Sequence, residues 1–186
     1  MAEQREFGNT VRDAIIGVIR GSSDITNAVI ETVSGTLVTS LKATHAVGTG
    51  VSKLVIDGVR GALQGTSEVG GDLASTAKNA VIGALQGTRE VGGEAAGLVR
   101  DAARGAVQGT AEVGGDLVIA AKSAVEGAVT AAKDIGLTAE EAASEAATGA
   151  LEAAGKVSGA AAGRVRRGLT GTISGVQVIF KEPSKE

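Results

Sequence analysis

The stretch GALQGTSEVGG at residues 61–71 decides the fold, because close copies of it follow at a fixed distance. Residues 83–93 read GALQGTREVGG and residues 105–115 read GAVQGTAEVGG, so the spacing is 22 residues each time. A fainter 11-residue frame underlies this repeat and runs from Val11 to Glu186 without an insertion. Eleven residues fill three turns of an α-helix at about 3.67 residues per turn. The period therefore predicts helices.

The residue types sort around such a helix. Positions 1, 4, 5, 8 and 9 of the 11-residue frame form one arc of mostly Val, Ile, Leu and Ala, and positions 2, 3, 6 and 10 hold most charged residues. This separation is typical of an amphipathic helix. A β-solenoid would not need it, and abundant Ala, Glu, Gln, Lys and Arg favour helix. We expect an all-α protein of long, glycine- and alanine-rich helices that pack side by side in an oligomeric assembly.

Glycine recurs along one edge of the predicted helix, at position 7 of every second unit except for Thr39, and often four residues later. A glycine inside a helix costs about 0.5–1 kcal/mol relative to alanine, whereas a small-xxx-small edge lets two helix backbones approach. We interpret the edge as a glycine zipper, with low-complexity drift as the alternative. The glycines assigned to helix packing and assembly are Gly17, Gly21, Gly61, Gly65, Gly83, Gly87, Gly105, Gly109, Gly127, Gly149, Gly171 and Gly175.

The Gly-Gly pairs at 70–71, 92–93 and 114–115 allow two interpretations. An acidic residue follows each pair, which is typical of a helix that stops and a new one that starts, and would give short helices of about 15–18 residues. Against this, the 11-residue phase passes through each pair unbroken. We favour a nearly continuous helix with soft points at the three pairs.

A stronger break is expected at Asp134–Glu141, where Gly136 suits a helix C-terminus and Thr138 with Glu141 forms a capping box. The predicted organisation has four parts. They are an N-terminal segment with a short helix (1–23), a long repeat helix (24–135), a second helical arm (139–172) and an extended tail (173–186). A continuous helix of that length, roughly 165 Å at 1.5 Å per residue, cannot bury its apolar face alone.

Composition excludes several classes of protein. The 186 residues include no Cys and one His, His45, so thiolate metal sites and catalytic triads are not expected. The net charge of −3 gives no general attraction to nucleic acid. The longest uncharged stretch, residues 168–180, is too short for the ~20 residues of a membrane-spanning helix. We expect a cytoplasmic protein that is not an enzyme and has no cofactor.

Charge is unevenly placed near the C-terminus. Residues 134–152 carry acidic side chains without a basic one, and residues 156–181 carry basic side chains without an acidic one. Opposite blocks of this kind suit a self-contact. We regard Arg164, Arg166 and Arg167 as possible electrostatic contacts, either with the acidic block or with phosphate or anionic lipid; a solvated face without a function is the alternative.

The 11- and 22-residue period, with elements such as TSEVGG at 66–71 and TAEVGG at 110–115, resembles a loose class of amphipathic helical-repeat proteins. The class comprises late-embryogenesis-abundant proteins, exchangeable apolipoproteins and synucleins. The chain departs from it because the repeat body lacks proline and aromatic residues, is poor in lysine and carries the glycine edge.

The leading hypothesis is a non-catalytic structural protein that self-assembles through its glycine edges into a filament, tube or sheet. Two interaction surfaces on each helix, the aliphatic arc and the glycine edge, permit open-ended association with further copies. The alternative is a lipid-surface protein whose aliphatic arc lies on a membrane, droplet or granule.

Overall fold

The computed structural model describes residues 2–21, 24–44, 48–90, 92 and 94–180. His45 and the last six residues of the predicted tail lie outside these ranges. The expected all-α class is confirmed, because the described chain is helical except for loops and one small hairpin. The elements are α1 (Ala2–Gly21), α2 (Ile25–Thr44), α3 (Thr49–Glu68), α4 (Leu73–Arg89), α5 (Ala95–Glu112), α6 (Leu117–Ala131), a 3-10 turn η1 (Ala132–Ile135), α7 (Ala139–Val157), α8 (Gly159–Leu169), β1 (Thr172–Ile173) and β2 (Val176–Gln177).

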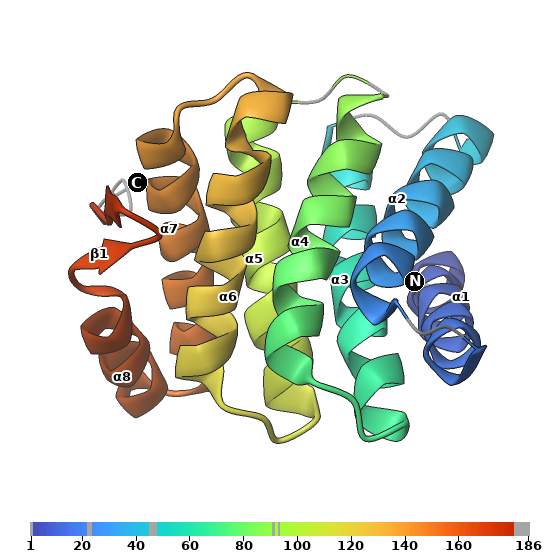
Figure 1. Ribbon diagram of the computed structural model, residues 1–186, viewed down its shortest axis with the longest axis horizontal. Helices are drawn as coiled ribbons and strands as arrows, with labels where there is room; N and C mark the ends of the chain where they lie inside the picture. Colours follow the sequence, from blue (N-terminus) through green and yellow to red (C-terminus); the bar gives the residue numbers. More distant parts are fainter. Residues whose placement is uncertain (1, 22–23, 45–47, 91, 93, 181–186) are drawn as a thin grey trace.

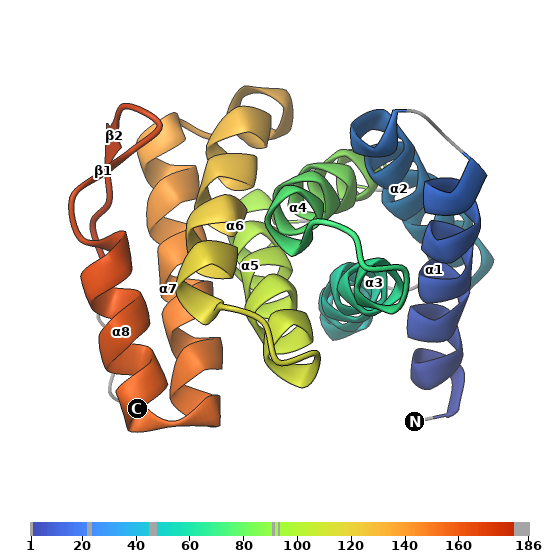
Figure 2. The same ribbon diagram turned by 60° about the horizontal axis from the view of Figure 1, so that its bottom comes forward.

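The helices pack side by side in two layers. Helices α1, α3, α5 and α7 follow one another in one layer, and α2, α4, α6 and α8 form the other, with α4 and α6 in front of α3 and α5 in Figure 1. Short connections reverse the chain after each helix, so helices of one layer run parallel. The N-terminal pair forms one end of the stack and α8 the other (Figure 2).

The turn after α3 explains why the chain reverses at the Gly-Gly pairs. Gly70 has a φ of +69°, in the left-handed region that favours glycine, and the Gly71 N–H donates to the Thr66 carbonyl oxygen at 2.9 Å. These are the features of a glycine-terminated helix. Asp72 then caps α4 by accepting a hydrogen bond from a backbone N–H of its first turn. The same turn recurs at Gly114, where φ is +73°.

The structure therefore differs from the predicted continuous helix over 24–135, which is divided into α2–α6. The left-handed glycines and the capping aspartates end one helix and start the next, as the short-helix interpretation had it. The predicted arm over 139–172 is likewise divided, because Ser158 caps α8 through a bond from the Ala161 N–H. The N-terminal helix is not short, since α1 has 20 residues.

The break predicted at 134–141 is confirmed. Gly136 adopts a φ of +77°, and α7 begins with a complete capping box in which Thr138 and Glu141 each accept a hydrogen bond from the other's backbone N–H. Because the pattern needs only local hydrogen bonds, it can be predicted without knowing the packing.

The aliphatic arc of the repeat lies between the layers. Val55, Val59, Leu63, Val81 and Val99 are fully buried there. The inward face of α7 is mostly alanine, whereas α8 and the segment after it add larger residues such as Val165, Leu169 and Ile173. The chain thus covers its apolar arc by folding back on itself, and it needs no second chain to bury that arc.

A β-hairpin covers the C-terminal end of the stack. Strands β1 and β2 pair antiparallel, with Ile173 opposite Val176. Ser174 and Gly175 both have positive φ, at 51° and 79°, as a two-residue hairpin turn of this kind requires. The buried residues Ile173, Val176 and Val178 join the hydrophobic core, so this end of the core is shielded.

Candidate functional site: the two ends of the stack

Most of the predicted glycine edge faces another helix of the same chain. In α3, α4, α5, α6 and α7 these glycines lie against the helix two positions earlier. A β-carbon at Gly83 would lie 2.6 Å from the carbonyl oxygen of Ile30, and one at Gly105 would lie 2.8 Å from that of Ile56. Gly127 faces the Lys78 backbone in the same way, also at 2.6 Å. The remaining glycines that are packed against a neighbouring helix are Gly61, Gly65, Gly87, Gly109 and Gly149.

Four of the predicted glycines have other surroundings. Gly171 and Gly175, with φ of +115° and +79°, belong to the hairpin region after α8 instead of a helix contact. Gly17 and Gly21 lie in α1 at the same repeat phase as the packed glycines, yet a β-carbon there would meet no atom within 4 Å. Among the described helices none packs against this side of α1, so this part of the edge is open.

We define the N-terminal surface as the exposed face of α1 formed by Asp13, Gly17, Arg20 and Gly21. It is polar and bears charges of both signs. The Asp13 carboxylate pairs with Arg12 at 2.8 Å and remains largely exposed. Arg20 has no ion-pair partner among the described residues.

A ladder of ion pairs, which the sequence reasoning missed, connects successive helices of the α1 layer. The Arg12 guanidinium lies 3.6 Å from Glu68, Arg60 lies 2.5 Å from Glu112, and Arg104 pairs with Glu152. Each pair joins a helix to the second one after it. The signal available in the sequence is the motif Asp-x-x-Arg at 57–60, which recurs two repeats later at 101–104.

The ladder also shows where the C-terminal acidic block lies. Glu145, whose side chain is 4% exposed, pairs with Arg100 of α5 at 2.7 Å, and Glu152 pairs with Arg104 of the same helix. The acidic block therefore contacts α5, and the predicted contact with the basic block does not form through these two residues. Burial of Glu145 makes the pairing necessary, because an unpaired buried carboxylate is strongly unfavourable.

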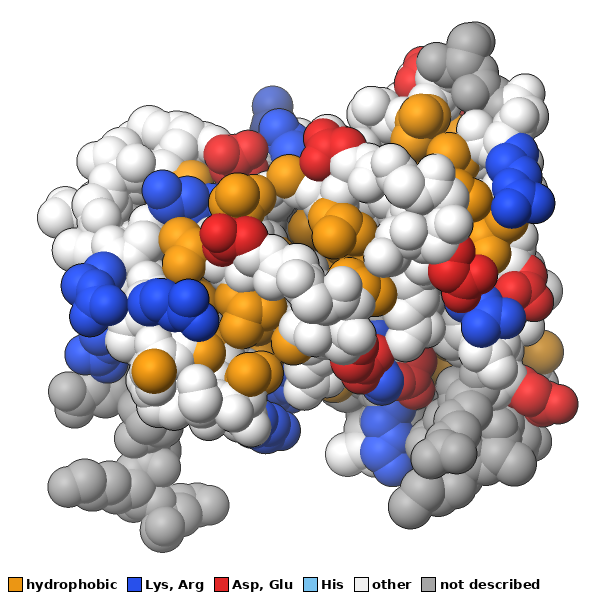
Figure 3. Space-filling view, turned by 90° about the horizontal axis from the view of Figure 1, so that it is seen from below, with side chains coloured by type: hydrophobic (Ala, Val, Ile, Leu, Met, Phe, Trp, Pro, Cys, Tyr) orange, Lys and Arg blue, Asp and Glu red, His pale blue; other side chains and the backbone are white. Residues whose placement is uncertain are grey.

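We define the C-terminal surface by the four cations Lys156, Arg164, Arg166 and Arg167, all of them exposed. Among the described residues none of them has an ion-pair partner. The Arg166 guanidinium lies over the ring of Phe180, 5.5 Å from its centroid. Lys and Arg side chains gather at the left edge of Figure 3, on the side where Figure 1 places α8.

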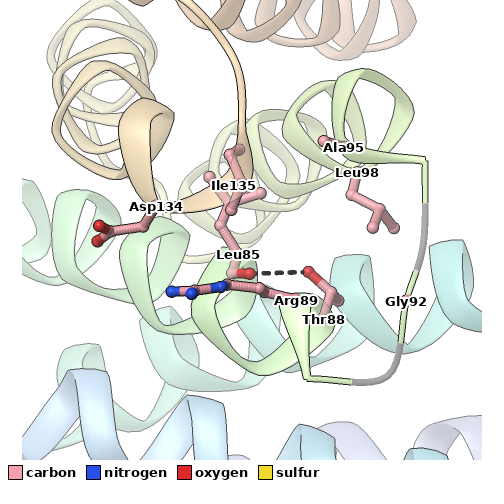
Figure 4. Close-up of a pocket in the computed structure, with 8 residues that line it drawn as sticks. All are labelled: Leu85, Thr88, Arg89, Gly92, Ala95, Leu98, Asp134 and Ile135. Carbon is pink, nitrogen blue, oxygen red and sulfur yellow. Dashed lines mark hydrogen bonds between the residues drawn. The ribbon is translucent and has the colours of Figure 1, made fainter.

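Two shallow cavities lie near the connections between helices. One of about 270 Å³ is bounded by Leu85, Leu98 and Ile135, with Arg89 and Asp134 on one side (Figure 4). Its one buried hydroxyl, on Thr88, is used within its own helix, where it donates to the carbonyl oxygens of Ala84 and Leu85. The walls therefore combine apolar side chains with polar and charged groups, and the polar part is the larger.

The second cavity, of about 290 Å³, lies between the turns that precede α4 and α6. Leu73 and Ile119 supply apolar walls, and the capping residues Asp72 and Asp116 stand beside them. Thr110 also lines it, but its hydroxyl oxygen is buried and lacks a hydrogen-bond partner. Both cavities therefore lie at connections between helices.

The comparisons with known proteins add no relative: no family model, curated protein or solved structure matches the chain. Over the described ranges, no helix is long and apolar enough to cross a membrane. The same part of the chain contains no group of three or more His, Asp or Glu residues placed to hold a metal ion.

Proposed function

We propose that the protein is a non-catalytic structural protein of the α-solenoid type, located in the cytoplasm, which self-associates through its N-terminal surface. The observation that carries the proposal is the difference between glycines at one repeat phase. In α3–α7 they lie against a neighbouring helix, whereas a β-carbon added at Gly17 or Gly21 of α1 would meet no atom of such a helix within 4 Å. A second copy of α1 would supply the missing neighbour.

Charge supports two copies of α1 as partners. Asp13 and Arg20 lie about one helical turn on either side of Gly17. If two α1 helices cross antiparallel at Gly17, Asp13 of each copy lies near Arg20 of the other. The contact is then the same on both copies and closes as a two-fold dimer.

The proposed assembly is a closed dimer, in place of the open-ended filament expected from the sequence. An open filament through the repeat needs free glycine edges along the body, and those of α3–α7 already contact helices of the same chain. It also needs a free far end, whereas Gly168 of α8 packs against Val118 of α6 and the hairpin covers α7. A closed dimer uses the one part of the edge that is open.

The lipid-surface alternative uses the aliphatic arc of the repeat. Because Val55, Val59 and Leu63 of that arc are fully buried, the layers would have to separate before the arc could lie on a membrane. That mode predicts a change in circular dichroism when vesicles are added. The dimer requires full helicity in plain buffer.

The test compares two substitutions at one position. Gly17→Leu places a large side chain at the centre of the proposed contact, and we expect light scattering coupled to gel filtration to find a dimer for the wild type and a monomer for the variant. Gly17→Ala should keep a weaker dimer. Gly35→Leu is the matched control, because a β-carbon added at Gly35 of α2 would also meet no packed atom within 4 Å, and Gly35 is exposed.

Two results would contradict the proposal. One is a wild-type protein that stays monomeric across the accessible concentration range. The other is a dimer of equal affinity in the wild type and Gly17→Leu, with both proteins equally helical by circular dichroism.

A further inference from the structure

The four cations of the C-terminal surface differ from the paired arginines of α3 and α5. Arg60, Arg100 and Arg104 each pair with a carboxylate on a neighbouring helix of their layer. Among the described residues, Lys156, Arg164, Arg166 and Arg167 have no such partner and all are exposed. The positive charge of this end is therefore available to a partner outside the molecule.

Exposed apolar side chains accompany these cations. Val157, at the end of α7, is 51% exposed, and Ile179, after the hairpin, is 62% exposed. They are two of the four large hydrophobic residues that remain exposed among the described ones. Phe180 lies beneath Arg166. This end thus combines cations with aliphatic groups, as a surface that lies on a charged interface does.

The connection between α7 and α8 is exposed. Residues 155–160 are consecutively exposed and consist of Gly155, Lys156, Val157, Ser158, Gly159 and Ala160. Apart from the lysine and the valine, they are small. An exposed stretch of small residues can lie close against a flat surface such as a membrane.

We propose that the C-terminal surface holds the folded protein on an anionic lipid membrane. Arg164 and Arg167, which lie on one side of α8 at i and i+3, bind the phosphate and carboxylate groups of the lipids, and Val157 and Ile179 enter the interfacial layer. This contact is independent of the self-association and leaves the aliphatic arc buried. It is also distinct from a membrane mode in which the helices separate.

The expected strength follows from the number of cations. Each Lys or Arg near an anionic membrane strengthens binding by about fivefold, and single weak signals give only reversible attachment. Four cations with only two exposed aliphatic side chains therefore predict binding that is reversible, that requires anionic lipid and that weakens as salt is added.

The experiment uses the full chain and vesicles of two compositions. One contains phosphatidylcholine alone and the other contains about 30 mol% phosphatidylserine, which reproduces the negative surface of an anionic leaflet. We expect co-sedimentation only with the second. The double variant Arg164→Gln/Arg167→Gln should bind about 25-fold more weakly, and Val157→Ser/Ile179→Ser should also weaken binding.

The control variant is Lys42→Gln/Arg89→Gln, which removes two exposed cations that lie outside both proposed surfaces. It should bind like the wild type, and thermal unfolding should establish that all variants are folded. Three outcomes would overturn the proposal: equal binding to both vesicle types, unchanged binding by the Arg164/Arg167 variant, or binding to a polyglutamate peptide without binding to vesicles. The last outcome would identify an acidic protein as the partner.

The test is separable from that of the self-association. The Gly17→Leu variant, although monomeric, should bind the anionic vesicles as the wild type does. The Arg164/Arg167 variant should still dimerise. The far-ultraviolet circular dichroism of the wild type should not change on binding, because the contact needs no rearrangement of the helices.

Discussion

Glycine has opposite effects at two positions of the same repeat phase. At Gly105 a β-carbon would lie 2.8 Å from the Ile56 carbonyl oxygen, whereas at Gly17 it would meet open space. Both residues lie inside helices, where alanine is intrinsically better than glycine by about 0.5–1 kcal/mol. Position in the stack therefore decides the sign of the effect.

This contrast gives the first prediction. Gly17→Ala should raise the free energy of unfolding by about 0.5–1 kcal/mol through helix propensity. Gly105→Ala should lower it by about 1–3 kcal/mol, because the α3 and α5 backbones must move apart. Urea denaturation of both variants, at a protein concentration where each is monomeric, measures the difference. Equal effects of the two substitutions would contradict the packing described for Gly105.

Thr110 has a buried hydroxyl whose partner is missing. In the preceding helix pair, α3 and α4, the hydroxyl of Thr66 lies 3.0 Å from that of Thr76, and the two are hydrogen-bonded. In the next helix pair, α5 and α6, the residue equivalent to Thr76 is Ala120, so the Thr110 hydroxyl oxygen has no hydrogen-bond partner among the described residues. A buried hydroxyl without a hydrogen bond is unfavourable.

Replacing this threonine should therefore stabilise the protein. Thr110→Val substitutes a methyl group of similar shape, and we expect a gain of about 1 kcal/mol in thermal or urea unfolding. Thr66→Val is the matched control and should instead destabilise by about 1 kcal/mol, since it leaves Thr76 without its partner. A loss of stability in Thr110→Val would mean that its hydroxyl is satisfied in solution.

Each helix and the turn before it are stabilised by the residue that caps the helix as well as by the glycine of the turn. The Asp72 carboxylate accepts hydrogen bonds from the Ala74 backbone N–H at 2.9 Å and from the Ser75 hydroxyl at 2.6 Å. The bond from Ser75, and then those from the backbone, hold the pKa of Asp72 below its usual value. The ionised cap thus favours the folded state.

The pH dependence follows from the lowered pKa. The stabilisation by Asp72 is complete above the unfolded pKa near 3.8 and is lost as the pH falls towards the lower folded value. Asp72→Ala should cost about 1 kcal/mol at pH 7, and the difference from the wild type should shrink below pH 4. Glu94→Ala is the control, because Glu94 precedes α5 without a side-chain cap bond. If the difference in stability between Asp72→Ala and the wild type were constant from pH 7 to pH 3, the stabilising role of the ionised Asp72 cap would be contradicted.

Local patterns could be predicted from the sequence, whereas the path of the chain could not. The capping box at Thr138 was predicted and confirmed because its hydrogen bonds are local. The continuous helix over 24–135 was wrong because a helix and its turn together occupy one 22-residue repeat. The 11-residue phase therefore passes through Gly70 and Gly71 unchanged whether the chain continues or reverses, and phase alone does not distinguish the two.

The candidate surfaces were predictable only in part. The glycine edge was visible as a pattern, but the sequence did not reveal that Gly83 would face a helix of the same chain and that Gly17 would be left open. This follows from the order of helices in each layer. The basic residues of α8 were visible as a block, while the burial of Glu145 against Arg100 depends on α5 and α7 being neighbours.

At the scale of the whole molecule, helices at an end of the stack have fewer neighbours than those in the middle. We expect their local stability to be lower. Helix α1 has a layer neighbour on one side only, while α5 lies between α3 and α7. In repeat arrays each unit is stabilised by its neighbours. We predict that amide hydrogen exchange is faster in α1 than in α5, and that α1 slows with rising protein concentration as copies associate. Uniform protection along the chain at all concentrations would contradict both statements.

The agreement between the repeat and the helix also constrains how the length of this protein can change. One 22-residue unit is one helix with its turn, so a single added unit would reverse the direction of every helix after it and exchange the two layers. The ladder that joins Arg60 to Glu112 and Arg104 to Glu152 would then lose its register. Duplication of two units keeps direction, layer and ladder together. Gain or loss of length is thus restricted to even numbers of units, a parity rule imposed by the reversal at each glycine turn.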